Sequence, residues 1–332
     1  MSELHRPRIE PVPPGEPRPR WSVMIPTYEC AGLLPAALEG VLAQDPGAEQ
    51  MQIEVVDDCS GDDPESVVRR YDGRAAFHRQ ERNLGHWGNL NSCLIRSRGD
   101  LIHVLHGDDA VRPGFYARME AAFADEAVGA AFCRFITIDD AGNWTAIAPL
   151  ERGDDGVIDD WLERIALGQR VQTPSMVVRR SVYEALGGFD DRAGDAEDWE
   201  MWTRIAAHTR VFHIVDPLAL YRIRATSLSR GTLRSGEHLK NLRRVVALNR
   251  DVLPDEQRDA IVKEARETIA LTAIKRARRF LGGGDAAAAR AQVRGALRTS
   301  RSPAVIERAV VFGLIAARRA VLRPLATLRR RG

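Results

Sequence analysis

The sequence has 332 residues, 44% of them hydrophobic, which is enough for one large or two modest domains with a buried core. Residues 1–230 hold 25 Lys and Arg against 37 Asp and Glu, a net of −12, whereas residues 231–332 hold 23 against 9, a net of +14. The four cysteines form no CxxC pair, which argues against a zinc knuckle or a disulfide framework and favours a reducing cytoplasm. The longest apolar run of the basic part, 309–317, is about half of the ~20 residues that a membrane-spanning helix needs, so no span is expected.

The first twenty residues are rich in Pro and Arg and contain no apolar stretch. This composition argues against a signal peptide, and we expect a disordered leader over 1–20. The elements expected next, from hydrophobic periodicity, are strands at 21–26, 53–56 and 101–106 and helices at 33–42, 64–71 and 90–95. Strands and helices that alternate in this way predict a parallel sheet with right-handed crossovers.

Each of these three strands ends in polar residues. Thr27 ends the first, Asp57 and Asp58 the second, and Asp108 and Asp109 follow the third. Because the carboxyl ends of parallel strands line one crevice in an open α/β sheet, we expect these side chains to converge. Carboxylates in such a crevice can bind Mg²⁺ or Mn²⁺ together with a substrate diphosphate. Turn formation explains each acidic pair alone, but the repetition at one edge favours a binding role.

The pattern changes after Val128. The expected elements are strands at 129–139, 176–180, 210–215 and 218–224, helices at 181–191 and 196–208, and helices beyond 230 that are interrupted at 281–285. Glu197 and Asp198 open one of these helices, where the helix dipole stabilises negative charge. They are therefore either structural or contain a general base at the mouth of the crevice.

Five segments carry a resemblance to a known family. They are, in order, SVMIPTYECAGLLPAALEGVLAQ, IEVVDDCSGDD, NLGHWGNLNSCLIRSRGDLIHVLHGDD, VVRRSVYEALGGFDD and EDWEMWTRIA. In the order and spacing of these motifs, residues 21–225 resemble glycosyltransferase family 2. The resemblance implies the GT-A fold, an α/β architecture with a mixed, mostly parallel sheet. We therefore expect a GT-A domain at 21–230, with a nucleotide-sugar half at 21–125 and an acceptor half at 126–230, and then a basic helical region at 231–332.

The resemblance also implies roles for individual residues. Asp198 matches the general base, and Asp108 matches the metal-binding acid of the family's DXD element. His106 stands where the family usually has another Asp, so the predicted metal ligands are Asp108 and His106; imidazole suits Mn²⁺ better than Mg²⁺. Glu29 stands where Asn is common. The residues expected to line the nucleotide-sugar site are Pro26, Thr27, Tyr28, Glu29, Asp57, Asp58, Asn83, Gly85 and Asp109.

The expected activity is inverting transfer of a sugar from a nucleotide-diphosphate donor to an acceptor hydroxyl, in cell-surface polysaccharide or glycolipid biosynthesis. The absence of QxxRW after Asp198 argues against a processive polysaccharide synthase. Two alternatives stay open. One is a polyprenyl-phosphate sugar synthase, whose phosphate acceptor needs no strong base. The other is a non-catalytic nucleotide-sugar-binding module, which the His106 departure raises.

Residues 301–332 carry eight Arg against one Glu within an apolar stretch. They either lie on an anionic membrane surface, at the inner face of the cytoplasmic membrane, or pack on the acidic part of the chain. The expected acceptor is a glycan or a lipid-linked molecule, and membrane contact would suit the lipid-linked one. Phe312 is the only aromatic residue after Phe280, which disfavours nucleic acid as a partner because few rings are present for base stacking.

Overall fold

The computed structural model describes residues 5–16, 18–224 and 228–328. Within them the chain forms two compact units. The first holds the described residues up to Ile165 and those from Gln169 to Arg224. The second holds Ala166–Gly168 and the described residues from 228 onward.

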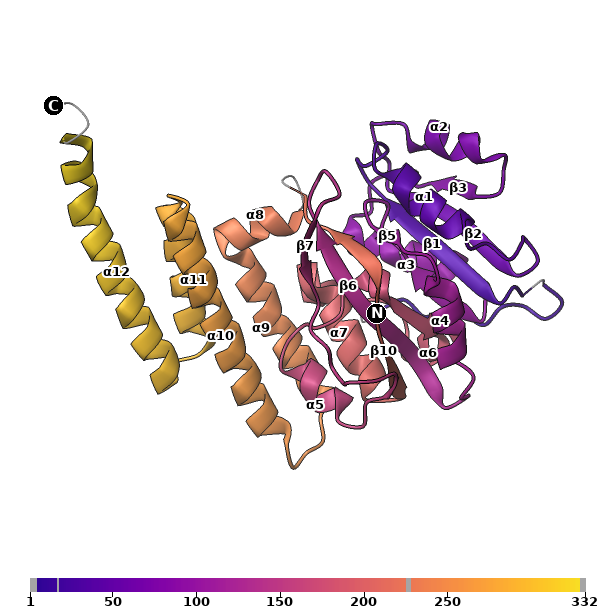
Figure 1. Ribbon diagram of the computed structural model, residues 1–332. Helices are drawn as coiled ribbons and strands as arrows, with labels where there is room; N and C mark the ends of the chain where they lie inside the picture. The colour runs from indigo at the N-terminus through magenta and orange to yellow at the C-terminus, as the bar shows by residue number, and fades with distance from the viewer. Residues whose placement is uncertain (1–4, 17, 225–227, 329–332) are drawn as a thin grey trace. The chain divides into compact units, whose positions relative to one another are not determined.

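The first unit is built on one mixed sheet (Figure 1). Its strands are β1 (Trp21–Thr27), β2 (Met51–Asp57), β3 (Ala76–Arg79), β4 (Leu101–Val104), β5 (Ala110–Val111), β6 (Val128–Ile138), β7 (Trp144–Ile147), β8 (Gly156–Val157), β9 (Met176–Arg179) and β10 (Arg210–Arg222). Their order is β3-β2-β1-β4-β9-β6-β10-β5, with β7 paired to β6 and β8 to β10. Strands β1 to β4 are mutually parallel, as are β6 and β10, whereas β9 is antiparallel to both neighbours. The predicted mixed, mostly parallel α/β architecture is confirmed.

Helices cover both faces of the sheet, and the side chains of β1 pack against helices on each face. Val23 and Ile25 belong to a large core cluster that includes residues of α1 and α4, whereas Met24 packs with Val56 and with Cys93 of α3. Successive residues of a strand point to opposite faces, so a strand covered on both sides needs an unbroken apolar run. The helices that accompany the sheet are α1 (Leu34–Leu42), α2 (Pro64–Val68), α3 (His86–Arg96), α4 (Phe115–Ala122), α5 (Trp161–Ala166), α6 (Arg180–Leu186) and α7 (Glu197–Ala206).

The two strands predicted at 210–215 and 218–224 are wrong as separate elements, because β10 is one continuous strand over Arg210–Arg222. Pro217 lies within this strand, although it has no N–H for a sheet ladder. The strand passes through it by shifting its register against β6 on both sides of this residue. Irregularities of this kind accommodate a proline without ending a strand.

The predicted disordered leader is also corrected in part. The backbone O of Pro7 accepts from Gly188 N at 2.9 Å, and the backbone O of His5 accepts from Asp191 N at 3.1 Å. The side chain of Ile9 is buried, with 1% of its surface exposed. The composition correctly indicates that this segment has no core of its own. The segment is ordered because its backbone O atoms accept hydrogen bonds from residues 188 and 191 and because Ile9 is buried.

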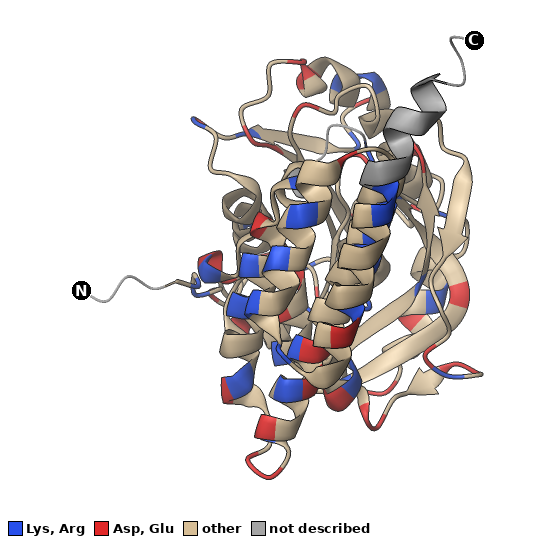
Figure 2. Cartoon of the chain, turned by 90° about the vertical axis from the view of Figure 1, so that its left-hand side faces the viewer, with Lys and Arg blue, Asp and Glu red and all other residues tan. Residues whose placement is uncertain are grey.

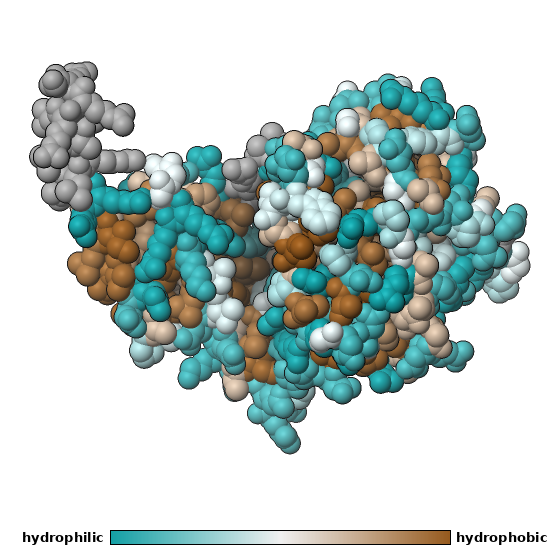
Figure 3. Space-filling model, in the orientation of Figure 1, coloured by the Kyte–Doolittle hydropathy of each residue, from teal (hydrophilic) through white to brown (hydrophobic). Residues whose placement is uncertain are grey.

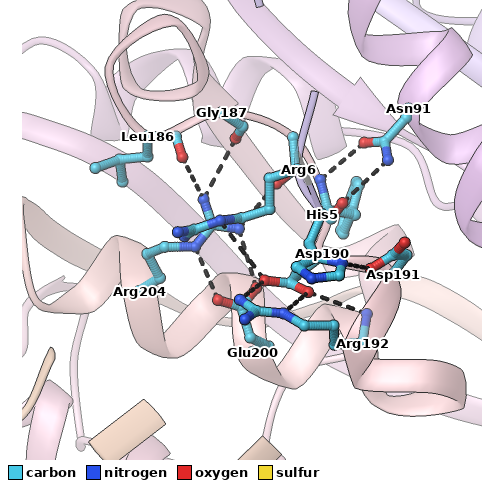
Figure 4. A network of polar contacts seen from close by, with 12 residues as sticks. His5, Arg6, Asn91, Leu186, Gly187, Asp190, Asp191, Arg192, Glu200 and Arg204 are labelled. Carbon is cyan, nitrogen blue, oxygen red and sulfur yellow. Dashed lines mark hydrogen bonds and ion pairs between the residues drawn. The ribbon is translucent and has the colours of Figure 1, made fainter. Parts of the chain in front are cut away.

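A network of charged side chains joins this segment to the residues that precede α7 (Figure 4). Arg6 Nε lies 3.6 Å from Asp190 Oδ2, and Arg192 Nη2 lies 2.6 Å from the same oxygen. Close by, the buried Arg204 is paired with Glu200 at 2.9 Å and donates to the backbone O of residues 186 and 188. The segment before α7 is therefore held by the N-terminal residues through Arg6 and by α7 itself through Arg204.

The second unit is helical, as predicted for the basic region. Its helices are α8 (Leu228–Ser235), α9 (Glu237–Asn249), α10 (Arg258–Gly282), α11 (Ala286–Thr299) and α12 (Pro303–Leu328). The interruption predicted at 281–285 is present over the shorter range 283–285, and Asp285 caps α11 by accepting from Ala288 N at 3.0 Å. Among the described residues, none of the helices is apolar over a length that would cross a bilayer.

Replacement of Ile9 by Ala should lower the free energy of unfolding of the first unit by roughly 2–4 kcal/mol, because it removes buried methyl groups and leaves a cavity. All six tryptophans lie between residues 21 and 202, so urea unfolding followed by Trp fluorescence reports on this unit. The matched control is Arg8→Ala, since the Arg8 side chain is 77% exposed and its loss should cost within about 0.5 kcal/mol. Equal effects of the two changes would contradict a buried anchor at Ile9.

Candidate active site

The ends of three strands adjoin at one edge of the sheet. Thr27 and Asp57 are register partners at the ends of β1 and β2, and Asp58 N donates to the backbone O of Thr27 at 2.9 Å. On the other side of β1, Gly107 N donates to the backbone O of Pro26 at 3.0 Å. A Cβ atom at Gly107 would lie 2.9 Å from Thr27 Oγ1, so glycine allows the loop after β4 to lie against β1.

The loop after β1 is tied to the loop after β2 through Glu29. Glu29 adopts a left-handed backbone with φ of 50°, and Cys59 in the facing loop does so with φ of 65°. Glu29 Oε1 accepts from Gly61 N at 2.7 Å, and Glu29 N donates to Ser60 Oγ at 3.0 Å. Left-handed non-glycine residues cluster at ligand sites because they store strain. Tyr28 beside this turn leaves 47% of its surface exposed.

Asp57 and Asp58 have different surroundings although they are adjacent. The Asp57 carboxylate is fully buried, accepts from the backbone N and hydroxyl of Ser60, and lies 3.6 Å from Arg79 Nη1. It therefore stabilises the turn after β2, as its Asx-turn interpretation requires.

Asp58 instead contacts the loop that leads into α3. Its Oδ1 accepts from Leu84 N at 2.7 Å, and its backbone O accepts from Asn83 Nδ2 at 3.2 Å. Asn83 Oδ1 in turn accepts from the backbone N of Gly85, whose φ of 76° suits glycine. Burial raises the pKa of the Asp58 carboxyl, although the backbone N–H groups of residues 84 and 85 oppose that shift. Three predicted nucleotide-site residues are thus in mutual contact.

The residues that could hold a metal form one cluster. One ligand atom each of His106, Asp108 and Asp109 lies within 4.8 Å of the others. His106 Nε2 and Asp109 Oδ2 are buried and accept or donate no hydrogen bond within the described part of the chain. Burial raises the pKa of Asp109 to about 6, while the His106 imidazole, whose Nδ1 lies 3.5 Å from Asp109 Oδ2, opposes the shift and the negative charge of Asp108 adds to it. Two carboxylates and an imidazole are suitable donors for Mn²⁺, and the unsatisfied atoms fit a bound cation.

Asp198 lies in the first turn of α7 and is half buried. Its Oδ1 accepts from Trp199 N at 2.7 Å, and its Oδ2 accepts from the side-chain amide of Gln169. Burial, followed by the negative charge of Glu197, raises the pKa of Asp198 to about 8. A carboxyl with such a pKa is a stronger base than an ordinary Asp, and perturbed groups of this kind mark functional sites.

His86 connects these acids to the candidate metal cluster and is missing from the sequence-based prediction. Its Nε2 lies 2.9 Å from Glu197 Oε1, and its ring meets that of His106 edge-on with centroids 5.2 Å apart. Burial disfavours its charged form, but Glu197, Asp198 and Asp108 together outweigh burial and raise the pKa of His86. Its place at the start of α3, directly after Gly85, a residue predicted to line the nucleotide-sugar site, is the signal that could have identified it.

Arg222 was also missed, and it fixes the loop after β4. Its backbone N donates to Asp109 Oδ1 at 2.8 Å, and its Nε donates to the backbone O of Asp108 at 2.8 Å. Arg222 lies at the end of β10, and no spacing in the sequence connects it to residues more than a hundred positions earlier. The antiparallel pairing of β10 with β5 creates this contact.

Comparisons with known proteins identify the fold. The Staphylococcus aureus protein TarS, residues 1–349 in complex with UDP-GlcNAc, superposes with a TM-score of 0.63 at 17% identity, over 75% of this chain and 72% of that one. The mannosyltransferase PcManGT from Pyrobaculum calidifontis, in complex with GDP-Man and Mn²⁺, gives a TM-score of 0.58 at 20% identity, over 97% of this chain and 86% of that one. The mixed sheet of the first unit therefore has the GT-A fold.

The sequence comparisons then give the family. The family model described as glycosyl transferase family 2 matches residues 22–186, and this domain of the chain belongs to that family. The succinoglycan biosynthesis protein ExoO of Rhizobium meliloti is 35% identical over 102 residues, which are 30% of this chain and 29% of that protein. The protein is a glycosyltransferase, as the five motifs predicted.

Replacement of His106 by Asp should shift the metal preference towards Mg²⁺, because Mg²⁺ prefers oxygen ligands and imidazole favours Mn²⁺. We expect the ratio of the Mg²⁺ to the Mn²⁺ dissociation constant to fall on the order of tenfold, as measured by isothermal titration calorimetry. Asp108→Asn is the control and should weaken binding of both ions. An unchanged ratio in H106D would contradict ligation by His106.

Proposed function

We propose that this glycosyltransferase moves a sugar from a nucleotide-diphosphate donor to an acceptor hydroxyl with inversion at the anomeric carbon. Asp198 is the general base, and the donor occupies the loops after β1, β2 and β3. The observation that carries the proposal is the contact of His86 with both Glu197 and His106, because it brings the start of α7 next to the cluster at the end of β4. In a single displacement, the general base and the diphosphate-binding site act on the two sides of the same anomeric carbon, so they must be neighbours.

The base acts on the acceptor. Asp198 in its ionised form takes the proton of the acceptor hydroxyl while that oxygen forms a bond to the anomeric carbon. The bond from this carbon to the diphosphate breaks, and its electron pair leaves with the nucleoside diphosphate. Gln169 and the backbone N of Trp199 hold the carboxylate in place, which fixes the direction of proton transfer.

His106 and Asp108 would hold a divalent metal, with Asp109 beside them. The chemistry that Mn²⁺ or Mg²⁺ supplies when bound is stabilisation of negative charge on the leaving diphosphate. The buried and unsatisfied His106 Nε2 and Asp109 Oδ2 support this assignment. The mannosyltransferase from Pyrobaculum calidifontis was solved with Mn²⁺, which is consistent with it.

The acceptor belongs to a cell-surface polysaccharide or a glycolipid. The similarity to a succinoglycan biosynthesis protein supports this assignment. A polyprenyl phosphate is the competing acceptor, and it differs chemically because a phosphate is already ionised and needs no base. The role of Asp198 therefore distinguishes the two acceptor classes.

Asp198→Asn should lower the rate of transfer by about a hundredfold to ten-thousandfold, because the amide cannot accept the proton of the acceptor hydroxyl. Donor binding should stay nearly unchanged. Both are measured with a panel of UDP-, GDP- and dTDP-sugars, with Mn²⁺, Mg²⁺ or EDTA present. Equal losses of transfer and donor binding would overturn the assignment of the base.

The pH profile provides the control for this variant. The pKa of Asp198 is about 8, and only the ionised carboxylate is a base, so transfer by the wild-type enzyme should rise with pH through that value. The residual activity of D198N should lack this rise. Full activity of D198N would favour a phosphate acceptor, and donor binding without turnover by the wild type would favour a non-catalytic module.

We propose further that the second unit binds the surface of an anionic membrane through α12. Ile306, Val310 and Leu314 recur every four residues on α12 and are 47%, 58% and 67% exposed. Figure 3 shows hydrophobic side chains gathered over this helix with hydrophilic ones beside them, and Figure 2 shows Lys and Arg along the helices of this unit. An apolar stripe flanked by Arg suits the interface of an anionic bilayer, because the guanidinium groups reach the headgroups while the apolar face is buried.

Leu314→Glu should reduce sedimentation of the protein with vesicles of phosphatidylcholine and phosphatidylglycerol by about tenfold, because it places a carboxylate in the apolar stripe. Leu150→Glu is the matched control, since Leu150 is 53% exposed in the first unit. Binding that is equally strong to pure phosphatidylcholine, or unaffected by L314E, would contradict the membrane surface. A concentration-dependent dimer that L314E dissociates would assign the stripe to a second copy.

A further inference from the structure

Arg224 connects the two loops that flank the proposed donor site. Its Nη2 donates to the backbone O of Glu29 at 3.1 Å, and its Nη1 lies 3.6 Å from Asp108 Oδ2. Glu29 belongs to the loop after β1, and Asp108 belongs to the loop after β4. The guanidinium therefore extends from the proposed nucleotide loop to the proposed metal cluster.

The Arg224 side chain is placed to bind a ligand as well as these two groups. It is 22% exposed, and the Asp108 side chain is 26% exposed, so the pair is open to the site. Its separation from Asp108 is longer than the roughly 2.7–2.9 Å of a close charge-assisted hydrogen bond. A guanidinium carries five N–H donors in one plane, so it can keep the contact with Glu29 and still donate to a phosphate.

Arg222, two residues earlier, has a structural role instead. Arg222 donates through Nε to the backbone O of Asp108 at 2.8 Å and through Nη1 to the backbone O of Asp139 at 2.9 Å. Backbone contacts of this kind fix a loop. Arg224 contacts a carboxylate at the loop's surface instead, where a bound diphosphate would replace or join that carboxylate as its partner.

The charge of the site also favours a cation at this position. Asp108, Asp109, Glu197 and Asp198 place four carboxyl groups around the site, and the diphosphate of a nucleotide sugar is itself anionic. Arg is always protonated and binds phosphate oxygens through two parallel hydrogen bonds. We infer that Arg224 binds the diphosphate of the donor and shares the stabilisation of its charge with the metal, an inference that rests on the proposed transferase function.

The test is titration of the full-length protein with UDP and GDP, each compared with its nucleoside monophosphate, in Mn²⁺ and in EDTA. Arg224→Ala should weaken binding of the diphosphate that the wild type recognises by roughly ten- to a hundredfold, because it removes charge-assisted hydrogen bonds. The monophosphate should lose less affinity. The loss should persist in EDTA, and Arg224→Lys should restore part of it because Lys keeps the charge but not the planar donor pair.

The matched control is Arg210→Ala, which removes an exposed arginine paired with Asp125 at the other end of β10 and should leave all affinities unchanged. Equal losses for the diphosphate and the monophosphate in R224A would assign Arg224 to support of the Glu29 loop and overturn the inference. Unchanged diphosphate binding by R224A would overturn it while leaving the transferase proposal intact. Failure of the wild type to bind any nucleotide would overturn both.

Discussion

The main physical constraint on the first unit is the concentration of negatively charged side chains at one edge of its sheet. Asp108, Asp109, Glu197 and Asp198 lie around His86, and the raised pKa values of Asp109 and Asp198 record the cost of ionising carboxyl groups that are buried together. A fold that served stability alone would separate these charges. Their retention in one place is what the proposed transfer requires, because a proton acceptor and a cation site for the diphosphate would both have to reach the same sugar.

The backbone around this edge is held by contacts that come from distant parts of the chain. Glu29 joins the first two loops, Asp58 holds the loop that leads into α3, and Arg222 fixes the loop after β4 from the far end of β10. The N-terminal segment and Asp190 fix the loop before α7 from outside. Charged groups that repel one another keep a defined geometry only when the backbone that carries them is constrained in this way.

The division of charge between the two parts of the chain matches a division of physical tasks. The acidic unit gathers carboxylates at strand ends, where parallel strands converge, and this arrangement suits the proposed binding of a cation and a nucleotide sugar. The basic unit presents an apolar stripe with Arg beside it on one helix, which is chemistry for an anionic surface. An acceptor embedded in a lipid surface would bring the two tasks together, because binding to that surface raises the local concentration of the acceptor.

The sequence alone predicted most of the long strands and helices and the polar residues at three strand ends, because hydrophobic period and turn residues act over short distances. The mixed sheet was implied only by the resemblance of the motifs to glycosyltransferase family 2. The sequence could not assign Asp57 to the turn and Asp58 to the loop before α3, since both occupy the same pattern and differ only in their partners. The contacts of Arg222 and Arg224 could not be predicted from the sequence for the same reason, nor could the burial of Ile9. His86 was missed although its position directly after Gly85 was a signal for it. Tertiary structure decided these contacts, because strand pairing between residues far apart in the sequence selects which side chains meet.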